Sequence, residues 1–250
     1  MRKLLFVMMA LLFVLAGCNS TPSSKSEKHE TLTVSAAASL TDVTKDLEKA
    51  FKKKNPNINV EFNYGGSGAL RTQIEKGAPA DVFMSANTKD VEQLKSSDKV
   101  KDTYDYAQNT LVLIQKEGQH YKSVRDLKQD DKLAIGEIES VPAGRYAKTY
   151  LESQNDWQFV QPHLVYAKDV REVLNYVSKG NAQLGFVYET DLYVGDAKHQ
   201  GVEKVTDVQL EDPIIYRMGI VSDKDAAHKW FAFLKSDEAK EILKQYHFKV

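Results

Sequence analysis

The sequence predicts an α/β fold, because short apolar runs alternate with helical patterns from Leu32 to the C-terminus. The runs are too short, and the helical patterns too regularly interposed, for a β-sandwich. With 250 residues, of which 42% are hydrophobic and 28% charged, the chain can bury one large core or two smaller ones. Its formal net charge of −1 gives no electrostatic footprint for nucleic acid, so no nucleic-acid partner is expected.

The first eighteen residues have the pattern of an export signal. Arg2 and Lys3 precede a short apolar run, and two small residues then lead to Cys18. The apolar run is short for a bilayer span of ~20 residues. The stretch "LAGC" resembles the lipobox of bacterial lipoproteins, which implies that Cys18 becomes lipidated and N-terminal after cleavage. We therefore assign residues 1–18 to a signal peptide with a lipobox.

Residues 19–30, "NSTPSSKSEKHE", predict a flexible tether, because they are polar and lack the apolar content to pack. Cys18 is the only cysteine, so the sequence predicts neither an intrachain disulfide nor a cysteine-based metal site. The mature protein is expected to be anchored to the outer face of the cell membrane by its lipid.

The first predicted strand, "LTVSA" at 32–36, is a buried apolar run that leads into small residues. A helix is expected at 39–53, where apolar residues recur on one face, with Ser39 as N-cap and Asp42 completing a capping arrangement. Further along, 58–65 alternate as a half-buried strand, 67–77 form a short helix closed by glycine, and 80–85 form another strand.

The rest of the chain repeats this pattern. Apolar runs predict strands at 109–115, 132–137, 163–167, 183–188, 202–208 and 214–221. Amphipathic patterns predict helices at 143–153 and 169–180, and two helical segments within 226–246. Asp169 is expected to cap the helix that starts at Val170.

Small or hydroxyl residues stand at five junctions where strands or loops meet helices. The junctions are "AAASL" with Ser39, "GGSGAL" with Ser67, "VPAGRY" with Ala143, "KDVREV" with Val170 and "FVYETD" with Tyr188. In open α/β sheets, ligands lie at the carboxyl ends of strands, and helix N-termini there offer unpaired N–H groups that suit an anion. Glycine and alanine let the backbone approach a compact ligand.

Each junction also has an ordinary structural explanation. Ser39 can be a simple N-cap, "GGSG" a turn, and "VPAG" a loop with proline in the first helical turn. Tyr188 can be a core tyrosine whose hydroxyl is satisfied by the protein. Periodicity alone therefore predicts only a site for an anion or another small ligand.

Taken together, "AAASL", "GGSGAL", "GAPADVFMSA", "VPAGRYAK", "AKDVREVL" and "LGFVY" resemble the molybdate-binding proteins of ABC importers. The resemblance covers nearly the whole mature chain, with the motifs in the family's order. It implies a two-lobed, type II periplasmic-binding-protein-like fold with the ligand in the interlobe cleft. Lobe one would comprise 32–108 plus 213–250, and lobe two 109–212.

The resemblance also implies the site. Ser39 and Ser67 would supply hydroxyls from lobe one, Ala143 and Val170 backbone N–H groups from lobe two, and Tyr188 its hydroxyl. The family often has a serine-rich second motif, whereas "GGSG" offers only the Ser67 side chain. Arg145 follows the third junction, and we expect it on a solvated helix face.

The implied function is that of an extracytoplasmic receptor, a monomer without cofactor or catalysis, that passes molybdate or tungstate to an ABC permease and its ATPase. Molybdate is a deprotonated dianion with only acceptors, so a donor-only site suits it. Sulfate also offers only acceptors, so a donor-only site suits it as well. Phosphate keeps a proton near neutral pH and needs at least one acceptor. A receptor for either of these oxyanions is the main alternative.

Two further classes are less well supported. A serine hydrolase would use Ser67, but "GGSGA" lacks the last glycine of the G-x-S-x-G elbow, and the six histidines (29, 120, 163, 199, 228 and 247) occupy no motif. A zinc or iron receptor would need metal-ligand spacing such as H-E-x-x-H or C-x-x-C, which the sequence does not contain.

Overall fold

The computed structural model describes residues 29–195 and 197–250. The signal peptide, Cys18 and residues 19–28 of the tether lie outside these residues. Glu30, the last residue assigned to the tether, already belongs to the first strand and pairs with Ile58. Among the described residues, no helix combines the length and the apolar character needed to cross a membrane.

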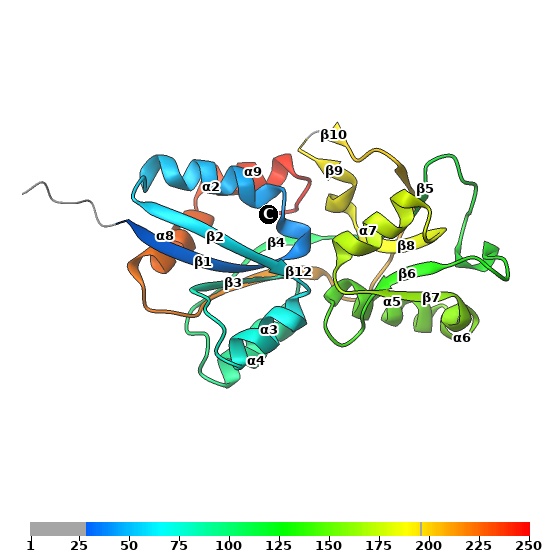
Figure 1. The fold of residues 1–250 in the computed structure, drawn as a ribbon, viewed down its shortest axis with the longest axis horizontal. Coiled ribbons are helices and arrows are strands. Elements are labelled where there is room, and N and C mark those ends of the chain that lie inside the picture. The colour runs from blue at the N-terminus through cyan, green and yellow to red at the C-terminus, as the bar shows by residue number, and fades with distance from the viewer. Residues whose placement is uncertain (1–28, 196) are drawn as a thin grey trace, which may run out of the picture.

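The first lobe is built on a five-stranded sheet in the order β2-β1-β3-β12-β4. Its strands are β1 (Glu30–Ala37), β2 (Ile58–Gly65), β3 (Val82–Ser85), β4 (Thr103–Asn109) and β12 (Ile214–Ile220). The strands β1, β2 and β3 are parallel, and β12 runs antiparallel to both β3 and β4. Helices α2 (Val43–Lys54), α8 (Asp225–Leu234) and α9 (Asp237–Gln245) cover one face, and α3 (Ser67–Glu75) and α4 (Lys89–Ser96) the other (Figure 1).

The second lobe has its own five-stranded sheet, in the order β11-β5-β8-β6-β7. The strands are β5 (Leu111–Lys116), β6 (Leu133–Gly136), β7 (Leu164–Ala167), β8 (Leu184–Tyr188) and β11 (Val202–Asp207). Helix α7 (Val170–Lys179) lies on one face, and α5 (Pro142–Ser153) with α6 (Trp157–Val160) on the other (Figure 1). The short strands β9 (Tyr193–Val194) and β10 (Ala197–Lys198) form a separate ribbon.

Four 3₁₀ turns complete the chain: η1 (Ala38–Leu40), η2 (Val124–Asp126), η3 (Gln161–His163) and η4 (Glu189–Leu192). Two of them matter for the site. Turn η1 follows β1 directly, and η4 follows β8 directly, so each stands at the carboxyl end of a strand.

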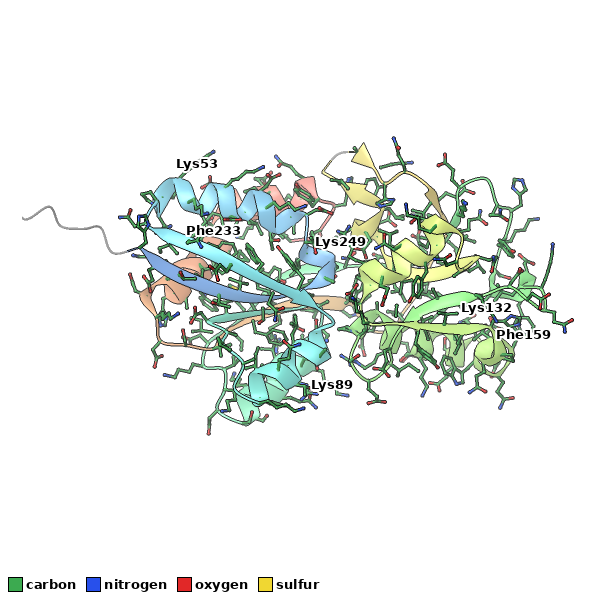
Figure 2. All side chains as sticks on the ribbon, in the orientation of Figure 1. Lys53, Lys89, Lys132, Phe159, Phe233 and Lys249 are labelled. Atoms are coloured by element: carbon green, nitrogen blue, oxygen red, sulfur yellow. The ribbon has the colours of Figure 1, made fainter. Side chains whose placement is uncertain are left out.

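The two lobes lie side by side and are joined by two crossings (Figure 1). The chain passes from β4 to β5 through Thr110 and returns between β11 and β12. The C-terminal tail adds to the first crossing, because the Gln108 and Lys249 backbones exchange two hydrogen bonds of 2.7 and 3.1 Å. Figure 2 shows Lys249 close to the boundary between the lobes, whereas Lys53 and Lys89 lie on the outer surface of the first lobe.

Large aromatic residues fill the layer between α2, α8 and the first sheet. Trp230 is fully buried and meets Phe51 edge-on, with ring centroids 5.1 Å apart. Phe62 and Phe233 pack against the same indole. This cluster joins the N-terminal and C-terminal segments of the chain into one core.

Most predicted elements are present, and one helix start was predicted wrongly. The helix expected at 39–53 begins only at Val43, after the short turn η1. Asp169 caps α7 as predicted, accepting a hydrogen bond of 2.9 Å from the Glu172 N–H. The strands β4, β9 and β10 and the helices α4 and α6 were not predicted.

Candidate functional site

A small cavity lies where the two lobes meet. Its volume is about 10 Å³, far below the ~300–1,000 Å³ of pockets that hold drug-sized molecules. The walls are formed by Ala37, Ala38, Ser39, Gly65, Gly66, Ser67, Ala86, Val141, Pro142, Val170 and Tyr188. Residues that are distant in sequence therefore converge on a space suited to one compact group.

The carboxyl end of β1 forms one wall of the cavity. Ala37, Ala38 and Ser39 are buried, and their small side chains leave the backbone close to the cavity. The N-cap role expected for Ser39 is wrong, since α2 starts four residues later and the Ser39 hydroxyl lies 2.9 Å from the Tyr216 hydroxyl instead. Ser39 is thus held by the sheet of the first lobe.

Ser67 reaches the cavity from the first residue of α3. Its N–H group has no intrahelical partner, as is general for the first turn of a helix. Its hydroxyl oxygen accepts a hydrogen bond of 3.0 Å from the Ala86 N–H. Because that interaction uses a lone pair and leaves the hydroxyl hydrogen free, Ser67 can donate into the cavity.

The second lobe contributes two helix N-termini. Val170 is the first residue of α7 and lines the cavity. Ala143 is the second residue of α5, but the wall there is formed by Val141 and Pro142 and does not include Ala143. Both N–H groups lie in first helical turns and lack intrahelical partners. The structure thus brings four of the five predicted residues to the cavity wall, and the fifth, Ala143, follows the wall residue Pro142 in sequence.

Tyr188, the last residue of β8, is the most informative wall residue. Its side chain is 1% exposed, and its hydroxyl has no hydrogen-bond partner among the described residues. Burial raises the pKa of this hydroxyl well above its ordinary value, so it stays a donor at physiological pH. A buried hydroxyl without a partner costs about 1–3 kcal/mol, and a ligand acceptor in the cavity would remove that cost.

All side chains on the cavity wall are uncharged, and the polar groups that face it can act as donors. The hydroxyls of Ser39, Ser67 and Tyr188 each carry a hydrogen, and the helix N-termini add N–H groups and the positive ends of helix dipoles. No histidine lines the cavity within the described chain, so Ser67 has no general base beside it. The described residues also contain no cluster of three or more metal-ligating side chains.

Around the cavity the lobes touch through backbone. The Gly68 N–H donates to the Ser140 carbonyl at 2.9 Å. A Cβ on Gly66 would stand 2.7 Å from the Ser140 carbonyl oxygen and 3.0 Å from that of Lys168. Glycine is needed here because the second lobe approaches this closely. The lobes are therefore in a closed arrangement.

Arg145 forms an ion pair across the lobes. Its guanidinium lies 2.8 Å from a carboxylate oxygen of the buried Asp90 at the start of α4. Arg71 contacts the other oxygen at 3.1 Å, and Asn87 also donates to this carboxylate. The expectation that Arg145 lies on a solvated helix face is wrong, because Asp90, which sequence patterns did not mark, faces it from the first lobe.

Arg171 forms a second ion pair between the lobes, beside α7. Its guanidinium lies 3.0 Å from Asp42, the residue immediately before α2. It also lies 3.0 Å from Asp191, although the alignment does not make a hydrogen bond. Asp42 therefore has a role other than the capping arrangement expected for it.

Three further residues support the wall without forming it, and no motif marked them. Tyr216, Asn109 and Thr190 form a buried polar network behind Ser39. Tyr216 comes from β12, far from Ser39 in sequence, so only the assembled sheet brings them together. An unbroken strand pattern gives no local signal for such a contact.

Asp191 gives a prediction about pH. Burial raises its pKa from 3.8 to about 6 despite the nearby Arg171. The folded state therefore holds this proton more tightly than the unfolded state, so the stabilising contribution is full below about pH 4 and is lost as pH rises through about 6. Relative to Asp191→Asn, the wild type should lose up to about 3 kcal/mol of unfolding free energy over this window. Urea denaturation at several pH values measures this, and parallel profiles for the two proteins would contradict it.

Comparison with known proteins places the chain in a family. A Bacillus subtilis protein described as an ABC transporter substrate-binding lipoprotein, YvgL, is 39% identical, with 94% of this chain and 93% of that protein covered. The molybdate-binding protein ModA of Haemophilus influenzae is 35% identical, with 99% of each covered.

The solved structure of the Azotobacter vinelandii periplasmic molybdate-binding protein has a TM-score of 0.77 to this one at 24% identity, covering 88% of this chain and 99% of that one. The predicted two-lobed fold of type II periplasmic binding proteins is thereby confirmed. Residues 32–249 match the family described as bacterial extracellular solute-binding protein. The chain belongs to this family of bacterial extracellular solute-binding proteins.

Proposed function

We propose that this protein is an extracytoplasmic receptor that binds molybdate or tungstate between its lobes and delivers the anion to an ABC permease. Relatives named as molybdate-binding proteins support this, including the one from Haemophilus influenzae. The observation that carries the proposal is the Tyr188 hydroxyl, which is buried, has no partner among the described residues and borders the cavity. It needs an acceptor, and an oxyanion supplies one.

The donor set argues for a fully deprotonated tetrahedral anion. Ser39, Ser67 and Tyr188 would donate hydroxyl hydrogens, and Ala143 and Val170 would donate backbone N–H groups. Each hydrogen bond to a charged group contributes about 1.5–3 kcal/mol, so five of them suffice for micromolar binding after ordering costs. The partial positive charge of helix N-termini balances part of the anion's charge, so no cation has to touch it.

The binding step in this proposal is closure of the two lobes. Lobe one would comprise 32–108 and 213–250, and lobe two 109–212, with the boundaries in the two crossings. An anion held by hydroxyls of lobe one gains the helix N-termini of lobe two only when the lobes meet. Closure is therefore favoured by the differential affinity of the anion for the closed form.

The receptor would act at the outer face of the cell membrane, held there by a lipid on Cys18. A family of extracellular solute-binding proteins and a relative described as a lipoprotein support this location. In this proposal the receptor works as a monomer. It has no catalytic role, which is supported by a family described by solute binding. Its partners would be the permease and the associated ATPase.

Binding of molybdate, tungstate, sulfate and phosphate by calorimetry tests the ligand. We expect tight binding of molybdate and tungstate, weak binding of sulfate and still weaker binding of phosphate, whose proton finds no acceptor. At a hundred times Kd, the ligand should raise the unfolding free energy by about 2.7 kcal/mol. Tighter binding of sulfate or phosphate than of molybdate would show that the ligand is that anion instead. Absence of measurable binding for all four anions would refute the proposal.

Replacing Tyr188 with phenylalanine should affect affinity and stability in opposite directions. Loss of the hydroxyl removes one hydrogen bond to the anion, so molybdate affinity should fall about tenfold to a hundredfold. The ligand-free protein should be as stable as the wild type or more stable, because none of the described residues forms a hydrogen bond with this hydroxyl. Tyr106→Phe removes another buried hydroxyl that has no partner in the part of the chain that the structure describes. Tyr106 is not a cavity-wall residue, so affinity should stay unchanged. An unaltered Kd for Tyr188→Phe would exclude its role.

Gly66→Ala should hinder closure without disturbing the first lobe. The added Cβ would clash with the Ser140 carbonyl of the other lobe at 2.7 Å. Its φ of −64° is accessible to alanine, so the fold itself should tolerate the change. We expect at least about tenfold weaker molybdate binding with an unchanged melting temperature of the ligand-free protein. An unchanged molybdate Kd for Gly66→Ala would contradict the steric role of this glycine in closure.

Arg145→Gln should weaken molybdate binding by removing an ion pair that exists only when the lobes are closed. The buried Asp90 keeps Arg71 and Asn87 as partners, so the variant should fold. A partly exposed pair is worth up to about 1 kcal/mol, which corresponds to about fivefold in Kd, mostly through faster release. Arg125→Gln removes an exposed pair with Asp156 inside the second lobe and should not change Kd. Equal effects of the two variants would contradict the assignment.

A further inference from the structure

A buried chain of hydrogen bonds stands behind Ser39. The Tyr216 hydroxyl lies 2.9 Å from the Ser39 hydroxyl. The Asn109 amide nitrogen lies 3.3 Å from the Tyr216 hydroxyl and 2.9 Å from the Thr190 hydroxyl. All four side chains are buried, so water does not compete with these bonds. The chain connects the end of β4, the strand β12 and the turn η4 to the cavity.

The direction of the first bond follows from the neighbouring backbone. The Thr110 N–H lies 2.9 Å from the Asn109 Oδ1, and a backbone N–H can only donate. The amide oxygen of Asn109 therefore faces Thr110, which places its NH₂ group toward Thr190 and Tyr216. Asn109 is a donor to the Tyr216 hydroxyl, and the opposite orientation would set an NH₂ group against an N–H.

The direction of the second bond follows from the first. Because Tyr216 accepts from Asn109, its own hydrogen needs an acceptor, and Ser39 is its other hydrogen-bond partner within the described residues. When Tyr216 donates to the Ser39 oxygen, the Ser39 hydrogen is left to point into the cavity. The Ala86 N–H likewise donates to the Ser67 oxygen, so the Ser67 hydrogen is also left for the cavity. Both serines are thereby held as donors.

We propose that Asn109 and Tyr216 are positioning residues that fix Ser39 as a donor, and that this polarity makes the site discriminate against protonated oxyanions. The proposal rests on the proposed function, since it assumes that Ser39 contacts the anion. Tyr216 occupies one of the two lone pairs of the Ser39 oxygen, and the Ser39 hydrogen, which cannot point at a donor, is directed to the anion. Ser39 is therefore poorly placed to accept the proton of hydrogen phosphate. A freely rotating serine hydroxyl could accept that proton as readily as it donates.

The polarity gives a selectivity pattern that a merely structural role does not produce. Molybdate and sulfate carry no proton at neutral pH, so both need donors only. Hydrogen phosphate carries one proton and gains if Ser39 becomes free to accept. Loss of the Tyr216 hydroxyl should therefore change the preference for molybdate over phosphate and leave the preference for molybdate over sulfate unchanged.

The experiment compares Tyr216→Phe with the wild type in titrations of molybdate, sulfate and phosphate at neutral pH. The phenylalanine keeps the ring that packs edge-on against Tyr106, Tyr188 and Phe248. We expect molybdate and sulfate to bind about tenfold more weakly, because the donor is no longer oriented, and phosphate to bind as well as before or better. The ratio of phosphate to molybdate dissociation constants should fall about tenfold.

Two further variants complete the design. Tyr106→Phe removes a neighbouring buried hydroxyl that has no partner in the described chain, and all three affinities should stay as in the wild type. Asn109→Leu removes the donor to Tyr216 and should shift the phosphate to molybdate ratio in the same direction. This variant keeps the test decisive if Tyr216→Phe does not fold.

An unchanged ratio, or an equal loss for all three anions in Tyr216→Phe, would overturn the proposal. Ser39→Ala separates this failure from failure of the proposed function. If Ser39→Ala weakens molybdate binding while the preference over phosphate survives in Tyr216→Phe, only the positioning role is wrong. If Ser39→Ala leaves molybdate binding intact, Ser39 does not bind the anion. Its proposed role in the site and the positioning role of Tyr216 and Asn109 are then both refuted.

Discussion

Separation of charge from the cavity is the constraint on which the rest of the structure depends. Arg145 lies three residues after the start of α5 and Arg171 one residue after the start of α7, close to the helix N-termini at the cavity, yet each is paired with a carboxylate of the first lobe. Their charges are therefore neutralised outside the cavity, in ion pairs that join the two lobes. Inside, only neutral donors remain. A site of this kind holds an anion by dipoles that are already oriented, with no flexible cation to reorganise.

The small residues at the end of β1 serve both close packing and close approach. Ala36 is fully buried between neighbouring strands of the sheet, while Ala37 and Ala38 line the cavity with their backbone. A larger side chain at either of the latter positions would occupy the cavity itself. These small side chains bury little apolar surface and so contribute little to the stability of the fold. The aromatic cluster around Trp230, at the other end of the lobe, offsets this.

The sequence allowed much of the fold to be predicted, because the strands are apolar runs and α7 has a clear cap at Asp169 and a left-handed glycine at Gly180. Serine before an amphipathic run gave a false N-cap at Ser39, since the chain first makes a 3₁₀ turn and tertiary bonding captures the hydroxyl. The wall residues came from junction motifs and a family resemblance. Asp90 and Tyr216 escaped prediction because their partners are brought to them only by the assembled lobes.

The order of strands in the first sheet has a consequence for the way the protein is made. β12 lies between β3 and β4, so β4 has no neighbour in that sheet until residues 214–220 have been synthesised and exported. The second sheet, by contrast, is built entirely from the continuous stretch 111–207. A chain that emerges from its N-terminus can complete the second lobe while the first lobe still lacks β12, which lies between two other strands of its sheet. The incomplete first sheet presents open strand edges during this interval, and open edges are where another chain can pair.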